Sequence, residues 1–363
     1  MHPIKPRNGI LNITPYKAGD AKIEGVANVI KLASNESPLG PSPAAVDAAK
    51  KAADAGLQLY PDPACTALRA AIGEVHGLDP TQIICSGGSE ELLHLLAKGY
   101  ATDGDEIIYC QYGFIAYPIT INAVGATPVM VSEDNYTANV DGIIAAVTPR
   151  TKLVNLANPN NPTGTYLTKA EVQRLRNGLR DDILLVLDAA YAEYVEQDDY
   201  DAGFELVDNG LENTIVTRTF SKIYGLAGAR VGWAYGPPSV LDILHRIRGT
   251  FNVTVMSQAA ATAAVRDRDH VAKAKAHNLK WVPEMSKALE DMGMTVTPSQ
   301  GNFILAHFPG GPEQAQAADT FLRSKGIIVR PVGNYDLAGA LRITIGTDAE
   351  NDALLSVMKT FFT

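Results

Sequence analysis

The chain contains the run TFSKIYGLAGAR at residues 219–230, in which Lys222 follows small hydroxyl residues and precedes a glycine-rich stretch ending in Arg230. Two upstream runs belong with it: NPNNPTG at residues 158–164 and DAAY at residues 188–191. Together they supply an amine, a carboxylate, a phenol, amides, hydroxyls and a guanidinium. This set can form a Schiff base and hold a pyridine nitrogen, a ring oxygen and a phosphate, as binding of pyridoxal phosphate (PLP) requires.

The composition is that of a globular protein large enough for two domains. The chain has 363 residues, of which 46% are hydrophobic and 20% charged. Its net charge of −9 argues against a general nucleic-acid or acidic-membrane binder. The cysteines (Cys65, Cys85 and Cys110) and the seven histidines lack metal-ligand spacing, so no metal site is expected.

The sequence predicts neither a signal peptide nor a membrane-spanning segment. The first 13 residues carry Lys5 and Arg7 but no apolar core of a signal peptide. No apolar stretch reaches the roughly 20 residues that span a bilayer. An odd number of unpaired cysteines is typical of a reducing compartment. We therefore expect a cytoplasmic protein with no membrane partner.

Between about residues 80 and 235, β-rich runs alternate with helical patterns. Residues 90–98, for example, place four leucines on one face of a helix. This alternation predicts an α/β layer on a mostly parallel sheet. The expected strands are Ile83–Cys85, Glu106–Tyr109, Pro128–Val131, Lys152–Leu156, Ile183–Leu187, Thr214–Arg218 and Val231–Tyr235.

Beyond residue 240 the pattern becomes a long helical region, residues 241–290, with expected interruptions near residues 249–253 and at Pro283. Short segments typical of an α+β domain follow. The first 40 residues are rich in Gly, Pro and Asn and cannot bury themselves. We expect an N-terminal arm (1–42) joining the small domain, a large PLP-binding domain (43–250) with a seven-stranded sheet sandwiched by helices, and a small α+β domain (251–363).

Three motifs follow expected strands, where ligands bind in open α/β sheets. Asp188 alone would often be a helix cap, but Tyr191 three residues later favours a cofactor site. Residues 158–164 have the composition of a turn, which can still aim Asn161 at a ligand. Gly87-Gly88-Ser89 precedes a helical pattern, where free N–H groups attract an anion, although Ser89 is also an ordinary N-cap residue.

The order of these motifs resembles that of fold type I PLP-dependent aminotransferases of the aspartate aminotransferase class. That order is a glycine-rich phosphate turn, an aromatic pair, Asn-Pro-x-Gly, Asp-x-x-Tyr, Ser-Lys, Arg and a C-terminal Arg. It extends from Leu32 to Thr347 in this chain. The resemblance implies a PLP-dependent transaminase that acts as a homodimer on small molecules.

The resemblance also implies a role for each matching residue of the cofactor site. Lys222 would form the Schiff base, Asp188 would pair with the pyridine nitrogen, and Phe114 would stack on the ring. Tyr191 and Asn161 would bind the ring oxygen. The residues that would hold the phosphate or lie in its turn are Gly88, Ser89, Glu90, Thr219, Ser221 and Arg230, with Tyr60 reaching the phosphate from the partner subunit.

On the substrate side, the resemblance implies that Arg342 clamps a carboxylate, which suits a planar guanidinium. Arg330, Tyr16 and Asn35 would face the rest of the substrate. Arg330 and Arg342 bracket an expected strand and turn, so they can converge on either of two anions. A surface or interdomain salt bridge is the other interpretation of Arg330.

Further runs are similar to the histidinol-phosphate aminotransferase subfamily, among them LASNESPLGPS at residues 32–42, YPDP at 60–63 and LRITIGT at 341–347. This similarity implies transamination between L-histidinol phosphate and 2-oxoglutarate, giving imidazole acetol phosphate and L-glutamate, in histidine biosynthesis. Aromatic-amino-acid (phenylalanine/tyrosine) aminotransferases and a threonine-phosphate decarboxylase share much of the pattern and remain alternatives. Regulators built on this fold carry a winged-helix domain, and no helix-turn-helix pattern precedes the fold here.

Overall fold

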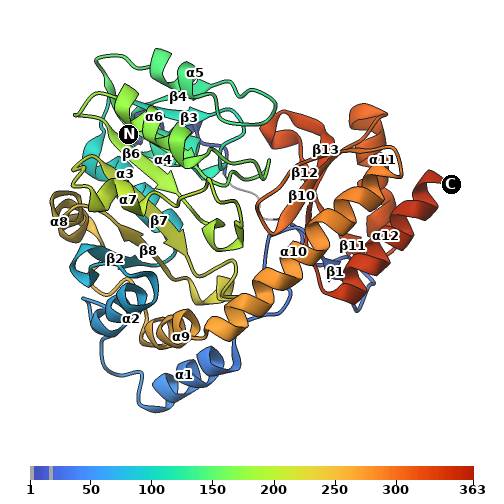
Figure 1. The fold of residues 1–363 in the computed structure, drawn as a ribbon, viewed down its shortest axis with the longest axis horizontal. Helices are drawn as coiled ribbons and strands as arrows, with labels where there is room; N and C mark the ends of the chain where they lie inside the picture. Colours follow the sequence, from blue (N-terminus) through green and yellow to red (C-terminus); the bar gives the residue numbers. More distant parts are fainter. Residues whose placement is uncertain (1–3, 16–18) are drawn as a thin grey trace.

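The computed structural model describes residues 4–15 and 19–363, and Figure 1 shows two lobes connected by one long helix, α10 (Arg268–Glu290). The larger lobe is built on a seven-stranded sheet and the smaller lobe on a four-stranded sheet. The described residues also form short 3-10 helices: η1 (Ile10–Asn12), η2 (Pro80–Gln82), η3 (Ala192–Tyr194), η4 (Ala227–Ala229) and η5 (Gly333–Tyr335).

The strands of the large sheet are β2 (Ile83–Ser86), β3 (Glu106–Cys110), β4 (Thr127–Val131), β5 (Thr151–Ala157), β6 (Leu184–Asp188), β7 (Thr214–Thr219) and β8 (Gly232–Tyr235). Their order is β2-β8-β7-β6-β5-β3-β4, and every neighbouring pair is parallel except the two that involve β8. The predicted α/β fold with a mostly parallel seven-stranded sheet is confirmed. Because β5, β6 and β7 are parallel, the residues at their carboxyl ends meet at one edge.

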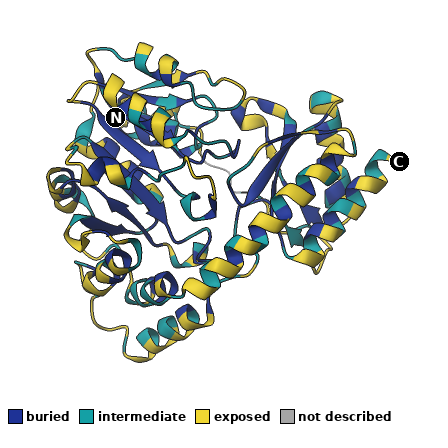
Figure 2. Cartoon of the chain, in the orientation of Figure 1, coloured by how far each residue is buried: buried dark blue, intermediate teal, exposed yellow. Residues whose placement is uncertain are grey.

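Helices cover both faces of this sheet. One face carries α3 (Ser89–Tyr100), α4 (Ala116–Val124) and α8 (Pro238–Ile247). On the other side lie α2 (Thr66–His76), α5 (Val140–Ala145), α6 (Lys169–Gly178), α7 (Phe204–Asp208) and α9 (Val255–Arg266), and α1 (Pro43–Asp54) packs against α9. In β6, Leu184 and Val186 face the first set of helices, whereas Leu185 and Leu187 face the second. Burial on both faces explains its unbroken apolar run, and Figure 2 shows the central strands as buried.

The small sheet has the order β12-β13-β10-β9 and is antiparallel throughout. Its strands are β9 (Thr295–Thr297), β10 (Phe303–His307), β12 (Arg330–Val332) and β13 (Leu337–Thr344). Its core includes residues of α10, α11 (Gly311–Ser324) and α12 (Asp348–Phe362). In the arm, β1 (Ile30–Lys31) pairs in parallel with β11 (Ile327–Ile328), and Leu32 is buried in the small core.

The change from one core to the other falls within α10. Ala260, Ala261 and Ala264 of α9 are buried in the core of the large lobe. Ala274 of α10 still belongs to that core, whereas Trp281 belongs to the small one. We therefore propose that the small domain comprises the arm near β1 together with the chain from the middle of α10 onward.

The expected interruption of the helical region near residues 249–253 is confirmed, because α8 ends at Ile247 and α9 begins at Val255. The expected interruption at Pro283 is wrong, because Pro283 lies inside α10. A proline removes one helical hydrogen bond and crowds the preceding turn. Trp281, Met285 and Leu289 are buried in the small core, and this packing holds the helix together through the proline.

Candidate active site

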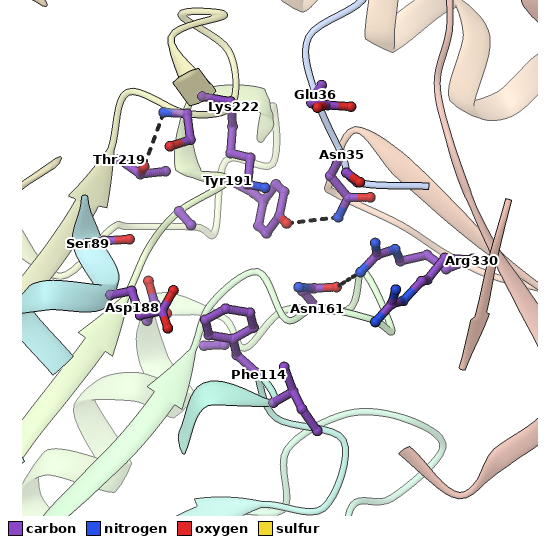
Figure 3. A pocket seen from close by; sticks show the side chains of 18 of the residues that line it. Asn35, Glu36, Ser89, Phe114, Asn161, Asp188, Tyr191, Thr219, Lys222 and Arg330 are labelled. Carbon is purple, nitrogen blue, oxygen red and sulfur yellow. Dashed lines mark hydrogen bonds between the residues drawn. The ribbon is translucent and has the colours of Figure 1, made fainter. Parts of the chain in front are cut away.

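A cavity of about 300 Å³ opens where the carboxyl ends of β5, β6 and β7 face the small lobe. Their last residues, Ala157, Asp188 and Thr219, all line it. The residues that the sequence predicts for the site and that line this cavity are Asn35, Ser89, Glu90, Phe114, Asn161, Asp188, Tyr191, Thr219, Ser221, Lys222, Arg230, Arg330 and Arg342. Figure 3 shows most of them around one central space.

The carboxylate of Asp188 accepts hydrogen bonds from two hydroxyl groups. The Tyr117 hydroxyl donates to Oδ2 at 3.1 Å, and the Thr217 hydroxyl donates to Oδ1 at 3.2 Å. Asp188 is 5% exposed, and burial raises its pKa to about 6, against the lowering effect of these two hydrogen bonds. A cationic ligand nitrogen would favour the ionised carboxylate, so this position suits a protonated ring nitrogen.

Lys222 follows β7 and turns its amine into the same cavity. Its Nζ lies 5.5 Å from the centroid of the Tyr191 ring. Burial lowers its pKa to about 8, and the positive charge of Arg342 adds to this, whereas Glu36 and Asp188 act in the opposite direction. Near neutral pH a useful fraction of the amine is therefore unprotonated and nucleophilic.

In the view of Figure 3, Tyr191 and Asn161 lie between Lys222 and Arg330. The Tyr191 hydroxyl accepts a hydrogen bond from Asn35 Nδ2 at 2.9 Å, and burial raises its pKa to about 12. Asn161 Oδ1 accepts from Arg342 Nη1 at 2.5 Å. Because a guanidinium only donates, the amide oxygen must face Arg342, which leaves the Asn161 nitrogen as a donor for a ligand.

A group of hydrogen-bond donors lies at one side of the cavity, and we call it the anion cradle. It comprises the turn at Gly88 and Ser89 together with Thr219, Ser221 and Arg230. Gly88 has a φ of +100°, and a Cβ there would lie 2.5 Å from Arg230 Nη2, so glycine lets the guanidinium lie against the turn. Arg230 Nη1 donates to Ser221 Oγ at 3.3 Å, and Ser221 N donates to Thr219 Oγ1. Ser89 starts α3, whose first N–H groups have no partner within the helix. This arrangement of donors suits a phosphate.

Glu90, also predicted for the cofactor site, lies in the first turn of α3 and lines the cavity. Its carboxylate would repel a phosphate, so only its backbone N–H suits the anion.

The substrate side carries two arginines on adjacent strands. Arg330 of β12 and Arg342 of β13 are direct register partners. Arg342 is 7% exposed and also donates from Nη2 to the Ala33 carbonyl oxygen at 2.8 Å. Asn35 is held by the Thr344 hydroxyl, which accepts from Asn35 N at 2.9 Å and donates to Asn35 Oδ1 at 3.1 Å. The arm is thus fastened to the strand that carries Arg342.

Tyr60, which the sequence also predicts for the site, does not line the cavity in the single chain. Tyr60 is 81% exposed and stacks on Phe251 with ring centroids 4.2 Å apart, away from the cavity lining. Tyr16 lies outside the described residues.

The sequence reasoning missed several contributors. Tyr117 and Thr217 bind Asp188, and Glu36, Ile115 and Tyr335 line the cavity. The position of Tyr117, three residues after Phe114, could have indicated its role. Thr217 is the register partner of Asp188 on the neighbouring strand. Glu36 directly follows Asn35 on the arm.

Within residues 4–15 and 19–363, no group of three or more His, Cys, Asp or Glu side chains could hold a metal ion. Over the same part of the chain, no helix is both long and apolar enough to cross a bilayer.

The fold is that of fold type I aminotransferases. The crystal structure of histidinol-phosphate aminotransferase from Sinorhizobium meliloti in complex with pyridoxal-5'-phosphate superposes with a TM-score of 0.87 and 30% identity, covering 92% of this chain and 90% of that one. Aspartate aminotransferase from Thermus thermophilus with maleate shares the fold at a TM-score of 0.81, with 92% and 91% coverage at 23% identity. Residues 27–358 match the family model described as aminotransferase class I and II, and the chain belongs to this family.

Relatives of known name are similar over almost the whole chain. A histidinol-phosphate aminotransferase of Paramagnetospirillum magneticum is 52% identical over 357 residues, which is 98% of each chain. One of Rhodopseudomonas palustris (strain TIE-1) is 50% identical over 358 residues, again 98% of each chain.

Proposed function

We propose that this protein is a PLP-dependent aminotransferase that exchanges the amino group between L-histidinol phosphate and 2-oxoglutarate, giving imidazole acetol phosphate and L-glutamate in histidine biosynthesis. The observation that carries the proposal is one cavity in which the Lys222 amine lies among Asp188, the anion cradle and the paired arginines. The names of relatives about 50% identical over 98% of the chain support the choice of substrate.

The residues around the cavity fit PLP group by group. Asp188 would pair with the ring nitrogen, and Asn161 and Tyr191 would donate to the ring oxygen. Phe114, which lines the cavity, would contact the ring face. The phosphate would lie at the start of α3, held by Gly88, Ser89, Thr219, Ser221 and Arg230. When bound, PLP supplies an aldehyde that condenses with amines and an electron-withdrawing ring that stabilises negative charge at the amino carbon.

The chain's own residues provide positioning and proton transfer. Lys222 Nζ, with a pKa of about 8, can take the proton from the substrate carbon that bears the amine. Arg342 would bind the substrate anion in two-point geometry and so orient the C–H bond to be broken. Asp188, held by Tyr117 and Thr217, would keep the cofactor ring protonated.

The site must accept two different anions in turn. Glutamate presents an α-carboxylate, whereas histidinol phosphate carries a phosphorylated carbinol at the equivalent carbon. Arg330 and Arg342 start from opposite register positions and line the same cavity, so together they can bind either group.

The assembly we propose is a homodimer with shared active sites. The segment around Tyr60 exposes large apolar side chains in a single chain: Leu57 is 61%, Leu59 72%, Tyr60 81% and Phe251 41% exposed. A patch of this kind is a candidate interface. In a second copy, Tyr60 would reach the neighbour's phosphate cradle. Free, buried Cys65, Cys85 and Cys110 suit the reducing cytoplasm, where we propose that the enzyme works.

A survey of half-reactions tests the substrate. The PLP-loaded protein is mixed in turn with L-histidinol phosphate, glutamate, phenylalanine, tyrosine and threonine phosphate, and the loss of cofactor absorbance is followed. We expect saturable reaction with histidinol phosphate and glutamate. Saturation by phenylalanine or tyrosine alone would indicate an aromatic-amino-acid aminotransferase, and release of carbon dioxide from threonine phosphate would indicate a decarboxylase.

A further inference from the structure

The acidic side chains lining the cavity are Glu36, Glu90 and Asp188. Asp188 lies at the end of β6 and accepts two hydrogen bonds there. Glu90 lies in the first turn of α3 beside the anion cradle. Both therefore belong to the cofactor end. Glu36 comes from the arm, and in the view of Figure 3 Asn35 lies between it and Arg330. None of the contacts proposed for PLP involves Glu36.

The backbone of Glu36 is held in place by buried contacts. Asn302, which is 1% exposed, donates from Nδ2 to the carbonyl oxygens of Asn35 at 3.0 Å and Glu36 at 3.3 Å. Asn35 N in turn donates to Thr344 Oγ1 at 2.9 Å. Glu36 thus has a fixed position relative to β13, the strand that carries Arg342.

The carboxylate of Glu36 forms an ion pair with Lys31, whose Nζ lies 2.7 Å from Oε1. The two side chains are 28% and 45% exposed, so this pair contributes little to stability. Its second oxygen can accept a further hydrogen bond, because a carboxylate offers several acceptor sites. The ionised group also lies close enough to Lys222 to affect that amine's charge.

We propose that Glu36 is the specificity-determining residue that recognises the ring N–H of an imidazole-bearing substrate. This inference rests on the proposed function and adds to it. Such a substrate has an anion at one end, an amine in the middle and a heteroaromatic ring at the other end. Arg330 and Arg342 suit the anion, and Lys222 meets the amine. Glu36 supplies an acceptor for the third group.

The chemistry of imidazole favours this assignment. The ring has at least one N–H donor whether it is neutral or protonated, so a carboxylate can bind it in either state. A phenyl ring has no donor, and placing it against Glu36 would remove water from the carboxylate without replacing the hydrogen bond. Sites built to hydrogen-bond a substrate reject analogues that lack the partner group more strongly than apolar pockets do.

Glutamate, the other substrate, has a side chain that ends in a carboxylate. Glu36 offers this carboxylate no favourable contact. Removing the Glu36 charge should therefore slow the half-reaction with histidinol phosphate and leave the half-reaction with glutamate unchanged.

The test compares Glu36→Gln with the matched variant Lys31→Met, which removes the same ion pair but lies outside the cavity lining. Glu36→Gln keeps an acceptor oxygen but removes the charge, so we expect kcat/KM for histidinol phosphate to fall by roughly tenfold, the effect of turning a charge-assisted hydrogen bond into a neutral one. The values for glutamate should stay within about threefold, and those for phenylalanine should stay or rise. Lys31→Met should retain the wild-type preference.

A binding measurement complements the kinetics. In the PLP-loaded Lys222→Ala background, calorimetry should show weaker binding of histidinol phosphate when Glu36→Gln is added, with unchanged binding of glutamate. Equal losses for both substrates, or equal effects of Glu36→Gln and Lys31→Met, would show that Glu36 only fastens the arm and would overturn the inference alone. A wild-type protein that reacts with glutamate but never with histidinol phosphate would overturn the proposed function and this inference together.

Discussion

Arg330 on β12 and Arg342 on β13 stand directly opposite each other in the antiparallel ladder, and both line the candidate active site. Like charges at opposite cross-strand positions are destabilising. Asn161 Oδ1 and the Ala33 carbonyl oxygen each accept a hydrogen bond from Arg342, which offsets part of the repulsion. A bound anion would add a favourable partner for both guanidinium groups.

Replacing each arginine should therefore have a different effect. Arg342→Ala is expected to lower kcat/KM by roughly a hundredfold for both glutamate and histidinol phosphate, because charge-assisted hydrogen bonds to the common anion are lost. Arg330→Ala should mainly raise KM for the phosphate ester, by roughly tenfold. Steady-state kinetics with both substrates measures this, and an Arg330→Ala enzyme with unchanged turnover of the phosphate ester would exclude a substrate role for Arg330.

Lys222 is expected to be the only lysine that links covalently to PLP. Reduction of the PLP-loaded wild-type protein with borohydride should add the mass of one cofactor per chain, on the peptide that contains Lys222. Lys222→Ala should gain no mass and show no turnover, whereas Lys98→Ala, on the exposed side of α3, should behave as wild type. Labelling of the Lys222→Ala protein to the wild-type extent would remove the basis of the proposed chemistry.

The stability of the cofactor-free protein should depend on pH through Asp188. Burial raises its pKa to about 6, above the value of about 4 for an unfolded chain, so the folded state binds more protons between these values. Stability therefore falls as pH rises through this window, and a cost on the order of 3 kcal/mol remains above it.

Asp188→Asn should remove that decline. Thermal unfolding of both cofactor-free proteins from pH 4 to 8 measures it, and we expect the variant to have the higher Tm at pH 7 to 8 although it is inactive. Parallel Tm curves for the two proteins would mean that Asp188 does not titrate in this range.

Tyr117→Phe should lower the affinity for PLP without changing the packing of α4. The variant loses the donor to Asp188 Oδ2, so the pKa of Asp188 rises further and the ionised form that pairs with the ring nitrogen becomes less populated. We expect roughly tenfold weaker PLP binding, measured by spectral titration. Tyr109→Phe, on β3 and outside the cavity lining, is the control, and an equal loss there would point to a general packing effect.

Shared active sites predict complementation between two inactive variants. In a mixed dimer of Tyr60→Ala and Lys222→Ala chains, one site carries both changes and the other carries neither. Mixing the variants under conditions of subunit exchange should recover roughly a quarter of wild-type activity, as random pairing across a two-fold interface requires. If each chain used its own Tyr60, the mixture would stay inactive.

Most of the cofactor end of the site could be predicted from the sequence. Asp188 is the last residue of β6, Lys222 comes three residues after the end of β7, and the parallel strands β6 and β7 bring both residues to one edge of the sheet whatever the details of packing. The same locality explains the correct strand positions. Local rules failed at Pro283, where burial of Trp281, Met285 and Leu289 outweighed the tendency of proline to end a helix.

By itself, the sequence determined the type of sheet and the groups that would hold PLP, because both depend on short runs of residues with fixed spacing. Only the tertiary structure decided that Tyr117 supports Asp188 from 71 positions away and that Asn35 on the arm reaches Tyr191 across 156 positions. It also set Arg330 opposite Arg342 and brought Glu36 to the cavity wall. These contacts depend on how two lobes and an arm pack, and a packing contact between distant residues leaves no pattern in the local sequence.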